Sequence, residues 1–148
     1  MAFYPIKFAI DGDSWLVTSP DFPEVTTFGD TQEDGARNAV SAIEEAISSR
    51  MADNQVLPPP YDDREGGQYA VQLPSMSLLK SWLYMICKLD NISRAELQRR
   101  LDVGRETIDR LFRLDHNSKL DQLERAFEAV GHPLEFGPAG RAWTHEAA

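Results

Sequence analysis

The fold is decided by residues 19–47, which read SPDFPEVTTFGDTQEDGARNAVSAIEEAI. Pro20 and Pro23 both lack the amide hydrogen that a sheet ladder needs, so they predict a loop at the start of this stretch. Residues 25–28 are all β-branched or aromatic and predict a short strand. Thr31 can then cap a helix, because its side-chain oxygen can accept from the first turn and an acidic residue follows three positions later. The stretch therefore predicts a loop, a strand and a helix in that order.

The predicted helix has one apolar face. Its apolar residues recur at intervals of three and four, as a helix that lies on a core requires. They are Ala36, Ala39, Val40, Ile43, Ala46, Ile47 and Met51. Gly35 departs from good helix composition, because glycine weakens a helix by about 1 kcal/mol relative to alanine. We therefore expect a helix that covers one side of a small sheet, with a weak point in its first turn.

Further strands lie on both sides of this stretch. Alternating apolar residues or β-branched composition predict strands at residues 3–10, 15–18, 25–28 and 69–73. An Asp-Gly turn at residues 11–13 predicts a hairpin between the first two. Residues 53–68 are polar and rich in proline and glycine, so they predict an exposed loop. The order strand, strand, strand, helix, strand predicts an α+β fold for a unit that spans residues 1–74.

The chain changes character after its fourth predicted strand. Residues 75–137 predict an all-α domain, and residues 138–148 predict a frayed tail. Ser93 and Ser118 are each followed three positions later by an acidic residue, and each is expected to cap a helix. Residues 102–104 interrupt the helical pattern between these two points. The second domain is therefore expected to consist of several short helices.

Charge is divided unevenly between the two parts. Residues 1–75 contain four basic and 13 acidic side chains, a net charge of −9. Residues 76–148 contain 11 of each kind and are neutral. An acidic surface repels nucleic acid and attracts basic proteins. The two parts are therefore expected to have different partners.

The single cysteine bears on the compartment. Cys87 excludes an intramolecular disulfide and indicates a reducing cytoplasm. It follows Ile86 on an apolar helix face, so we expect a buried thiol. The longest apolar stretches are shorter than the roughly 20 residues that cross a bilayer, and the N-terminus lacks the basic start of a signal peptide. We expect a cytoplasmic protein with Trp15 and Trp82 in its core, and we assign no role to Trp143.

Two short helices around residues 102–104 predict a helix-turn-helix, the motif with which many proteins read the major groove. Its buried positions are assigned to Leu97, Leu101, Val103, Ile108 and Leu111. The exposed face of its second helix carries Arg105, Glu106, Asp109, Arg110 and Arg113. Arginine can bridge O6 and N7 of guanine, and a carboxylate can accept from cytosine or orient the arginines. A plain helical hairpin with a solvated charged face explains the same pattern, so both interpretations stay open.

Three further residues are assigned to DNA. Ser93 and Arg94 begin the first of these helices and are expected to hold phosphate, although Ser93 is equally explained as a cap. Gly104 begins the second helix and is counted with them. The second helix has a net charge of only +1, so we expect a homodimer or a higher oligomer that reads two half-sites. Residues 120–130 and 134–136 are the expected seam, and the sheet edge is the alternative.

Two stretches carry a family resemblance. Residues 92–134, ISRAELQRRLDVGRETIDRLFRLDHNSKLDQLERAFEAVGHPL, resemble the Cro/repressor-like helix-turn-helix, especially the form fused to HicB antitoxins. Residues 19–47 resemble the HicB N-terminal core motif, in which a Pro-Asp-x-Pro loop is followed by a strand, Gly-Asp-Thr and an alanine-rich helix. There are departures: Glu24 replaces a glycine, Gln98 replaces a small residue, and Asp102 replaces the usual glycine of the turn.

The resemblance implies an antitoxin. Its N-terminal domain would have a degenerate ribonuclease-H-like fold and would cover the active site of HicA, a small basic ribonuclease that is the toxin. Its C-terminal domain would bind operator double-stranded DNA and repress the protein's own operon. The residues assigned to toxin binding are Asp11, Asp21, Phe22, Pro23 and Glu24. Phe22 is interpreted either as an apolar anchor for the toxin or simply as a core residue.

A metal-dependent nuclease is the alternative function. Four carboxylates could hold two metal ions, namely those of Asp11, Asp13, Asp21 and Glu24. Carboxylates in turns are also explained by local bonds to the backbone. The histidines have no ligand spacing and predict no zinc site; they are His116, His132 and His145. We therefore expect no catalytic residue, no metal and no cofactor.

Overall fold

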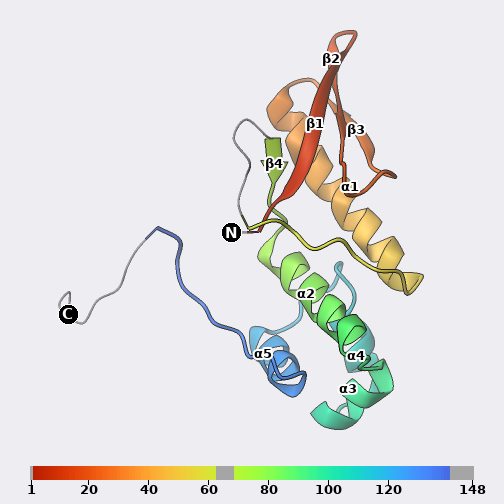
Figure 1. Cartoon of the computed structure of the whole chain (residues 1–148), viewed down its shortest axis with the longest axis vertical. Coiled ribbons are helices and arrows are strands. Elements are labelled where there is room, and N and C mark those ends of the chain that lie inside the picture. The colour runs from red at the N-terminus through yellow and green to blue at the C-terminus, as the bar shows by residue number, and fades with distance from the viewer. Residues whose placement is uncertain (1, 63–68, 141–148) are drawn as a thin grey trace, which may run out of the picture.

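The structure, a computed structural model, describes residues 2–62 and 69–140. An antiparallel sheet lies against one long helix, and shorter helices follow it in the chain (Figure 1). The N-terminal elements are β1 (Tyr4–Asp11), β2 (Ser14–Thr18), β3 (Thr26–Gly29), α1 (Gln32–Ala52) and β4 (Tyr69–Val71). The predicted α+β class and the order of these elements are confirmed, with strand ends that differ by one or two residues.

The sheet has the strand order β3-β2-β1-β4, and neighbouring strands are antiparallel. Gly12 turns the β1–β2 hairpin with a φ of 62°, which confirms the predicted Asp-Gly turn. Tyr4 and Ile6 are buried, as the alternation of β1 predicts, whereas Ile10 is 73% exposed. The tip of this hairpin projects past the start of α1 (Figure 1). Ile10 therefore lies beyond the part of the sheet that the helix covers.

α1 approaches β3 very closely at its first turn. Thr31 caps the helix as predicted, because its Oγ1 accepts from the amide of Asp34 at 3.0 Å. A Cβ on Gly29 would lie 2.6 Å from the Cα of Gly35, and a Cβ on Gly35 would lie 2.7 Å from Val17 Cγ2. From the sequence, Gly35 is expected only to weaken the helix. In the structure its small size lets the helix and the sheet meet.

The chain after residue 74 is helical. Its helices are α2 (Ser75–Leu89), α3 (Arg94–Leu101), α4 (Arg105–Leu111) and α5 (Leu120–Ala129). Ser93 caps α3 as predicted, since its Oγ accepts from the amide of Glu96 at 3.0 Å. The cap predicted at Ser118 is wrong. Lys119, in extended conformation, is the residue that immediately precedes α5, and no side chain caps this helix start. Ser118 is buried.

Buried apolar residues of the two parts form one continuous cluster. α1 and α2 contact each other directly, and Tyr84 of α2 donates to the carbonyl of Gln55 at 2.6 Å. Lys88 of α2 donates to Asn54 Oδ1 at 2.8 Å. The predicted division after residue 74 therefore coincides with no break in the core, and we keep it as a proposal about which part binds which partner.

The sequence predicts that Cys87, Trp15 and Trp82 are buried. Cys87 is a buried free thiol, as predicted, and burial raises its pKa to about 11. Trp15 and Trp82 are only half-buried, so they lie at the margin of the core rather than inside it. Trp143 and His145 lie outside the described residues.

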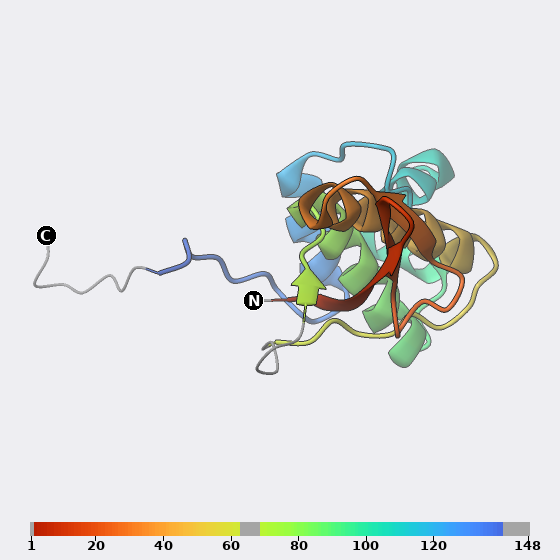
Figure 2. The same cartoon turned by 90° about the horizontal axis from the view of Figure 1, so that it is seen from above.

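The C-terminal segment leaves the helical part. Beyond Leu134, which still packs against the core, the segment runs away from α5 in both views (Figures 1 and 2). Phe136 in this segment is 63% exposed. In the part of the chain that the structure describes, no helix is both long enough and apolar enough to span a membrane.

Candidate DNA-binding and partner-binding surfaces

α3 and α4 are joined by a tight turn at Asp102. This residue is left-handed, with φ 53° and ψ 52°, a conformation that aspartate tolerates better than most residues. Leu97, Ile108 and Leu111 are buried as predicted. Leu101 and Val103 are only half-buried and pack against the same core. The departure from glycine at Asp102 therefore leaves the two helices packed together.

The predicted reading face of α4 is exposed. The side chains of Arg105 and Glu106 are 88% and 77% exposed. Each arginine of the face has an acidic neighbour: Arg110 Nη2 lies 2.5 Å from Glu106, and Arg105 Nε lies 3.9 Å from Asp109. These acids hold the arginines along the helix, which is one of the two roles that the sequence leaves open. A nucleic acid would have to replace such exposed pairs, which are individually weak.

A cleft of about 960 Å³ separates the C-terminal end of α1 from the α3–α4 pair. Ser93, Arg94, Asp109 and Arg113 line it together with residues of α1. Arg94 donates to Asp109 Oδ1 at 3.1 Å and lies over the ring of Phe112, 4.9 Å from its centroid. Arg94 therefore ties the start of α3 to α4. Arg105, Glu106 and Arg110 do not line this cleft.

Arg113 stands apart from the rest of the reading face. It lies two residues beyond the end of α4, and its guanidinium makes two bonds to Asp115, at 3.0 and 2.9 Å. This pairing raises the pKa of Arg113 and lowers that of Asp115. A contact between Arg113 and DNA would first have to break a pair with bidentate geometry.

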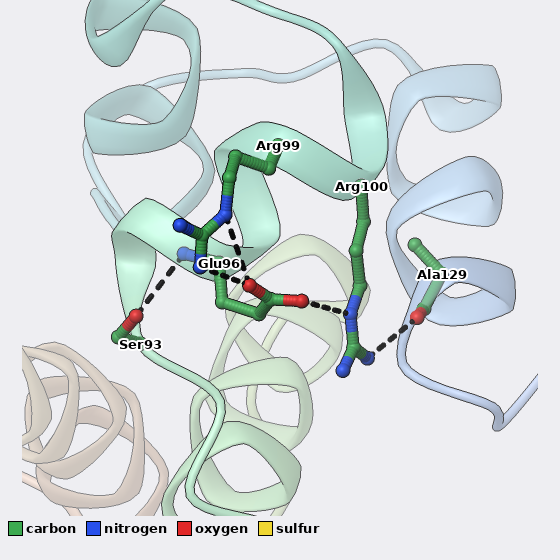
Figure 3. Close-up of polar contacts among 5 residues, drawn as sticks. All are labelled: Ser93, Glu96, Arg99, Arg100 and Ala129. Carbon is green, nitrogen blue, oxygen red and sulfur yellow. Dashed lines mark hydrogen bonds and ion pairs between the residues drawn. The ribbon is translucent and has the colours of Figure 1, made fainter.

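α3 carries a cluster of charged residues that the sequence analysis misses. Glu96 accepts from both Arg99 and Arg100, as Figure 3 shows. Hydrogen bonds from Arg99 and then Arg100 lower the pKa of Glu96. Arg100 also donates to the carbonyl of Ala129 at 3.0 Å, near the end of α5. The cluster therefore ties α3 to α5.

Lys80 is the second feature that the sequence analysis misses. Its side chain is fully buried, and its Nζ donates to three backbone carbonyls at the end of α4 and in the segment after it, those of Arg110, Arg113 and His116. Burial lowers the pKa of Lys80 to about 8, although the nearby carboxylate of Asp115 opposes this effect. A lysine in an apolar helix pattern gives no sign of such a partner, because the partners are backbone atoms some 30 residues away.

The proline-bounded loop does not present Phe22 to a partner. Phe22 is fully buried, and its ring packs edge-on against Tyr4 with centroids 5.2 Å apart. The interpretation of Phe22 as an exposed anchor is therefore wrong, and the core interpretation is the one that the structure supports. The Val25 amide donates to the Phe22 carbonyl at 2.9 Å, which makes a turn and leaves the ring inside. Pro23 in the same loop remains exposed.

Glu24 is held by a residue of α1. Two hydrogen bonds of 2.7 and 2.8 Å join its carboxylate to the guanidinium of Arg50, which also lies over the ring of Phe22. The hydrogen bond to Arg50 is the main reason why the pKa of Glu24 is lowered. The loop is therefore fixed to α1 rather than free.

The four carboxylates of the nuclease alternative do not come together. Asp11 and Asp13 lie at the hairpin turn, where Asp11 pairs with Ser14. Asp21 and Glu24 follow β2 at its other end. Among residues 2–62 and 69–140, no three histidine, cysteine, aspartate or glutamate side chains gather as metal ligands. The observed positions therefore do not favour a two-metal site.

One face of the sheet is not covered by α1. Val17 and Phe8 point toward Gly35 of the helix, so their neighbours along the strands lie on the opposite face. There Leu16 pairs with Phe28 across β2 and β3, and Phe28 is 47% exposed. This apolar site on an acidic unit is missed from the sequence, although the alternation of β2 contains the signal.

Antitoxins are among the known proteins that this chain resembles. A sequence model of the family described as HicB_like antitoxin of bacterial toxin-antitoxin system matches residues 3–82. Antitoxin HicB 2 of Photorhabdus laumondii is 33% identical over 89% of this chain and 93% of its own length. Antitoxin HicB of Pseudomonas fluorescens is 32% identical over 83% and 84%, and Antitoxin HicB of Escherichia coli K12 is 29% identical over 88% and 95%.

These matches confirm the resemblance drawn from residues 19–47, which lie inside the stretch that the family model matches. That stretch ends within α2, so α3 and α4 lie outside it. DNA reading by α3 and α4 stays a prediction that rests on their own geometry.

Proposed function

Since the chain belongs to the HicB-like antitoxin family, we propose that it neutralises an RNA-cleaving toxin of the HicA type and represses its own promoter through α3 and α4. The observation that carries the proposal is the family match over residues 3–82. Most of the acidic excess of the chain lies in the same part, as expected for a surface that binds a basic toxin. The proposal assigns the toxin to the sheet unit and DNA to the helical part.

Charge supports the toxin-binding role. A net charge of −9 in residues 1–75 attracts a basic ribonuclease and speeds its association. Asp11, at the hairpin tip, and Pro23 are exposed and available to such a partner. Phe28 on the open face of the sheet adds an apolar contact of the kind that interface centres favour. We keep Asp21 and Glu24 in the proposed surface as charges at its rim, with Phe22 supporting the loop from inside.

Exposure supports the DNA-binding role. Arg105 and Arg110 are both exposed on a short helix, and both can bridge guanine once their acidic neighbours give way. Gly104 begins this helix, and a Cβ there would meet no atom within 4 Å, so the backbone is open to a phosphate. Ser93 and Arg94 stand at the start of α3, where backbone amides attract anions.

Affinity requires more than one copy. α4 together with Arg113 has a net charge of only +1 and binds weakly, so we propose a homodimer that reads two half-sites. Leu120 of α5 is 50% exposed and Phe136 is 63% exposed, and both lie in the segments that we assign to the seam. Light scattering at micromolar concentration tests this, and a monomer would count against it.

Two assays in one bacterial strain test the proposal. Growth during expression of the neighbouring toxin measures neutralisation, and a reporter on the chain's own promoter measures repression. Arg105→Ala with Arg110→Ala should weaken repression by at least about 10-fold, because one bidentate base contact contributes about 1–3 kcal/mol per half-site. The same variant should still rescue growth.

A matched control is available on α1. Arg37 is 69% exposed and paired with Glu33 and Asp34, much as Arg110 is paired with Glu106. Arg37→Ala should leave repression unchanged. Failure of the wild-type chain to rescue growth would refute the toxin-binding role. Unchanged repression in the double variant would refute DNA reading by α4.

A further inference from the structure

Lys80 holds one end of the helix to which we assign DNA reading. Lys80 lies on α2, and its side chain is fully buried, which is uncommon for a lysine. Its Nζ donates to the carbonyl oxygens of Arg110, Arg113 and His116, at 2.8, 2.7 and 2.6 Å. An ammonium group has three hydrogens. Every one of them is therefore directed at the backbone near the end of α4.

The position of these carbonyls gives the contact its importance. The last carbonyls of a helix have no partner inside it and form the negative end of its dipole. A buried cation at this end adds a charged hydrogen bond to one such carbonyl and to two from the segment that follows. The carbonyls of Arg110 and Arg113 also accept the amides of Arg113 and His116. α4 has only seven residues, too few to be stable alone. Contacts with its neighbours must therefore fix where α4 lies.

No ion pair competes for Lys80 among the residues that the structure describes. The nearest opposing charge, Asp115, is already bound by Arg113 through two hydrogen bonds. Lys80 therefore bonds to backbone carbonyls and not to a particular side chain. Changes in the reading side chains of α4 would leave this contact in place.

We propose that Lys80 is a positioning residue for DNA reading: its buried ammonium fixes the end of α4 to α2 and so sets where Arg105 and Arg110 lie. The inference rests on the proposed DNA-binding function. Both arginines belong to one short helix, and Arg94 holds the same half of that helix through Asp109. A tilt of the end that Lys80 holds would therefore move both arginines together relative to the groove.

The test compares two lysines on α2. Lys80→Met keeps the length of the side chain and removes the ammonium. Lys88→Met is the matched control, because Lys88 lies on the same helix but bonds to Asn54 instead of α4. Fluorescence anisotropy of each full-length variant measures affinity for the chain's own promoter. Amide hydrogen exchange, measured without DNA, compares protection in α4 with protection in α1.

Lys80→Met should lower promoter affinity at least about 10-fold, because hydrogen bonds to a charged group stabilise the observed position of α4 by about this factor or more, and α4 must be in that position to read DNA. Exchange in α4 should become faster by at least as much, while exchange in α1 stays as in the wild type. Lys88→Met should change neither quantity. Wild-type affinity in a folded Lys80→Met chain, or an equal loss of protection in α1 and α4, would overturn the inference.

A measurement on the wild-type chain covers the case in which Lys80→Met does not fold. Nitrogen-edited spectra at neutral pH should contain one lysine ammonium resonance protected from solvent exchange, with couplings to the carbonyl carbons of Arg110, Arg113 and His116. Absence of that resonance would overturn the inference without any variant. If the wild-type chain does not prefer its promoter, the proposed DNA-binding function fails, while the resonance and the exchange in α4 still report on the contact itself.

Discussion

α1 and α4 are fixed in place by opposite means. The 21-residue α1 lies on β3 where Gly29 and Gly35 bring one backbone against another. The 7-residue α4 is held by charged side chains that reach it from other helices, Lys80 from α2 and Arg94 from α3. The first contact should fail when an atom is added, and the second when a charge is removed. Stability should therefore depend most on the first, and DNA binding on the second.

The largest effect on stability is expected from adding one methyl group between α1 and β3. Gly29→Ala would place a Cβ 2.6 Å from the backbone Cα of Gly35, and neither backbone can move without disturbing the sheet. Overpacking of this kind costs up to about 3 kcal/mol, and occasionally more. Urea unfolding followed by circular dichroism measures the loss.

The control for this substitution is Gly137→Ala. A Cβ on Gly137 would meet no atom within 4 Å, and Gly137 has no positive φ. Its free energy of unfolding should stay within about 0.5 kcal/mol of the wild type, as for most surface changes. Equal stability of Gly29→Ala and Gly137→Ala would show that the close approach of α1 to β3 is absent in solution.

A smaller and equal effect is expected at the two helix caps. Thr31 and Ser93 each accept from an amide three residues later, at 3.0 Å. Thr31→Ala and Ser93→Ala should each lower the free energy of unfolding by about 1 kcal/mol. Ser118→Ala tests the cap that the sequence predicts for α5. Because Ser118 does not cap α5, amide exchange in α5 should change less than the loss of a cap would cause. Faster amide exchange that is confined to α5, and that corresponds to about 1 kcal/mol, would show that Ser118 does cap this helix.

The smallest effect is expected at Glu24, and it should depend on pH. Hydrogen bonding to Arg50 lowers the pKa of Glu24 in the folded chain. Its stabilising effect is therefore fully present above the ordinary glutamate pKa of about 4.3, and is lost as pH falls through the lowered folded value. Because Glu24 is 43% exposed, solvent screening limits the effect to about 0.5–1 kcal/mol.

Arg50→Met tests this directly. Its deficit in free energy of unfolding, relative to the wild type, should be larger at pH 7 than at pH 3. The part that remains at pH 3 reports the contact of Arg50 with the ring of Phe22, which does not need the carboxylate. A deficit that does not change between pH 7 and pH 3 would mean that the Glu24–Arg50 pair contributes nothing.

Local patterns of the sequence predict local structure well. The Asp-Gly turn at Gly12 and the caps at Thr31 and Ser93 are all found where the pattern places them. Each depends on atoms within three residues of one another, so residue type and spacing contain the whole signal. The exception is Ser118, where extended Lys119 moves the helix start by one residue.

Contacts between distant parts of the chain are not predictable in this way. Lys80 bonds to carbonyls 30 to 36 residues away, and Arg100 bonds to one 29 residues away. Carbonyl groups are present at every position, so no residue type marks them as partners. Phe22 is a similar case, because its ring is buried against Tyr4, which lies 18 residues earlier in the chain. The candidate DNA surface is thus predictable in its side chains but not in what positions it.

Fluorescence anisotropy of the full-length chain tests most directly whether α3 and α4 read DNA. At one stated salt concentration, affinity is measured for the chain's own promoter and for a shuffled fragment of equal length. We predict a preference for the promoter of about 1,000-fold or more, as for specific binders generally. Arg105→Ala with Arg110→Ala should reduce that preference at least about 10-fold, in line with the loss of bidentate base contacts. Equal affinity for both fragments, or an unchanged preference in the double variant, would contradict DNA reading by this surface.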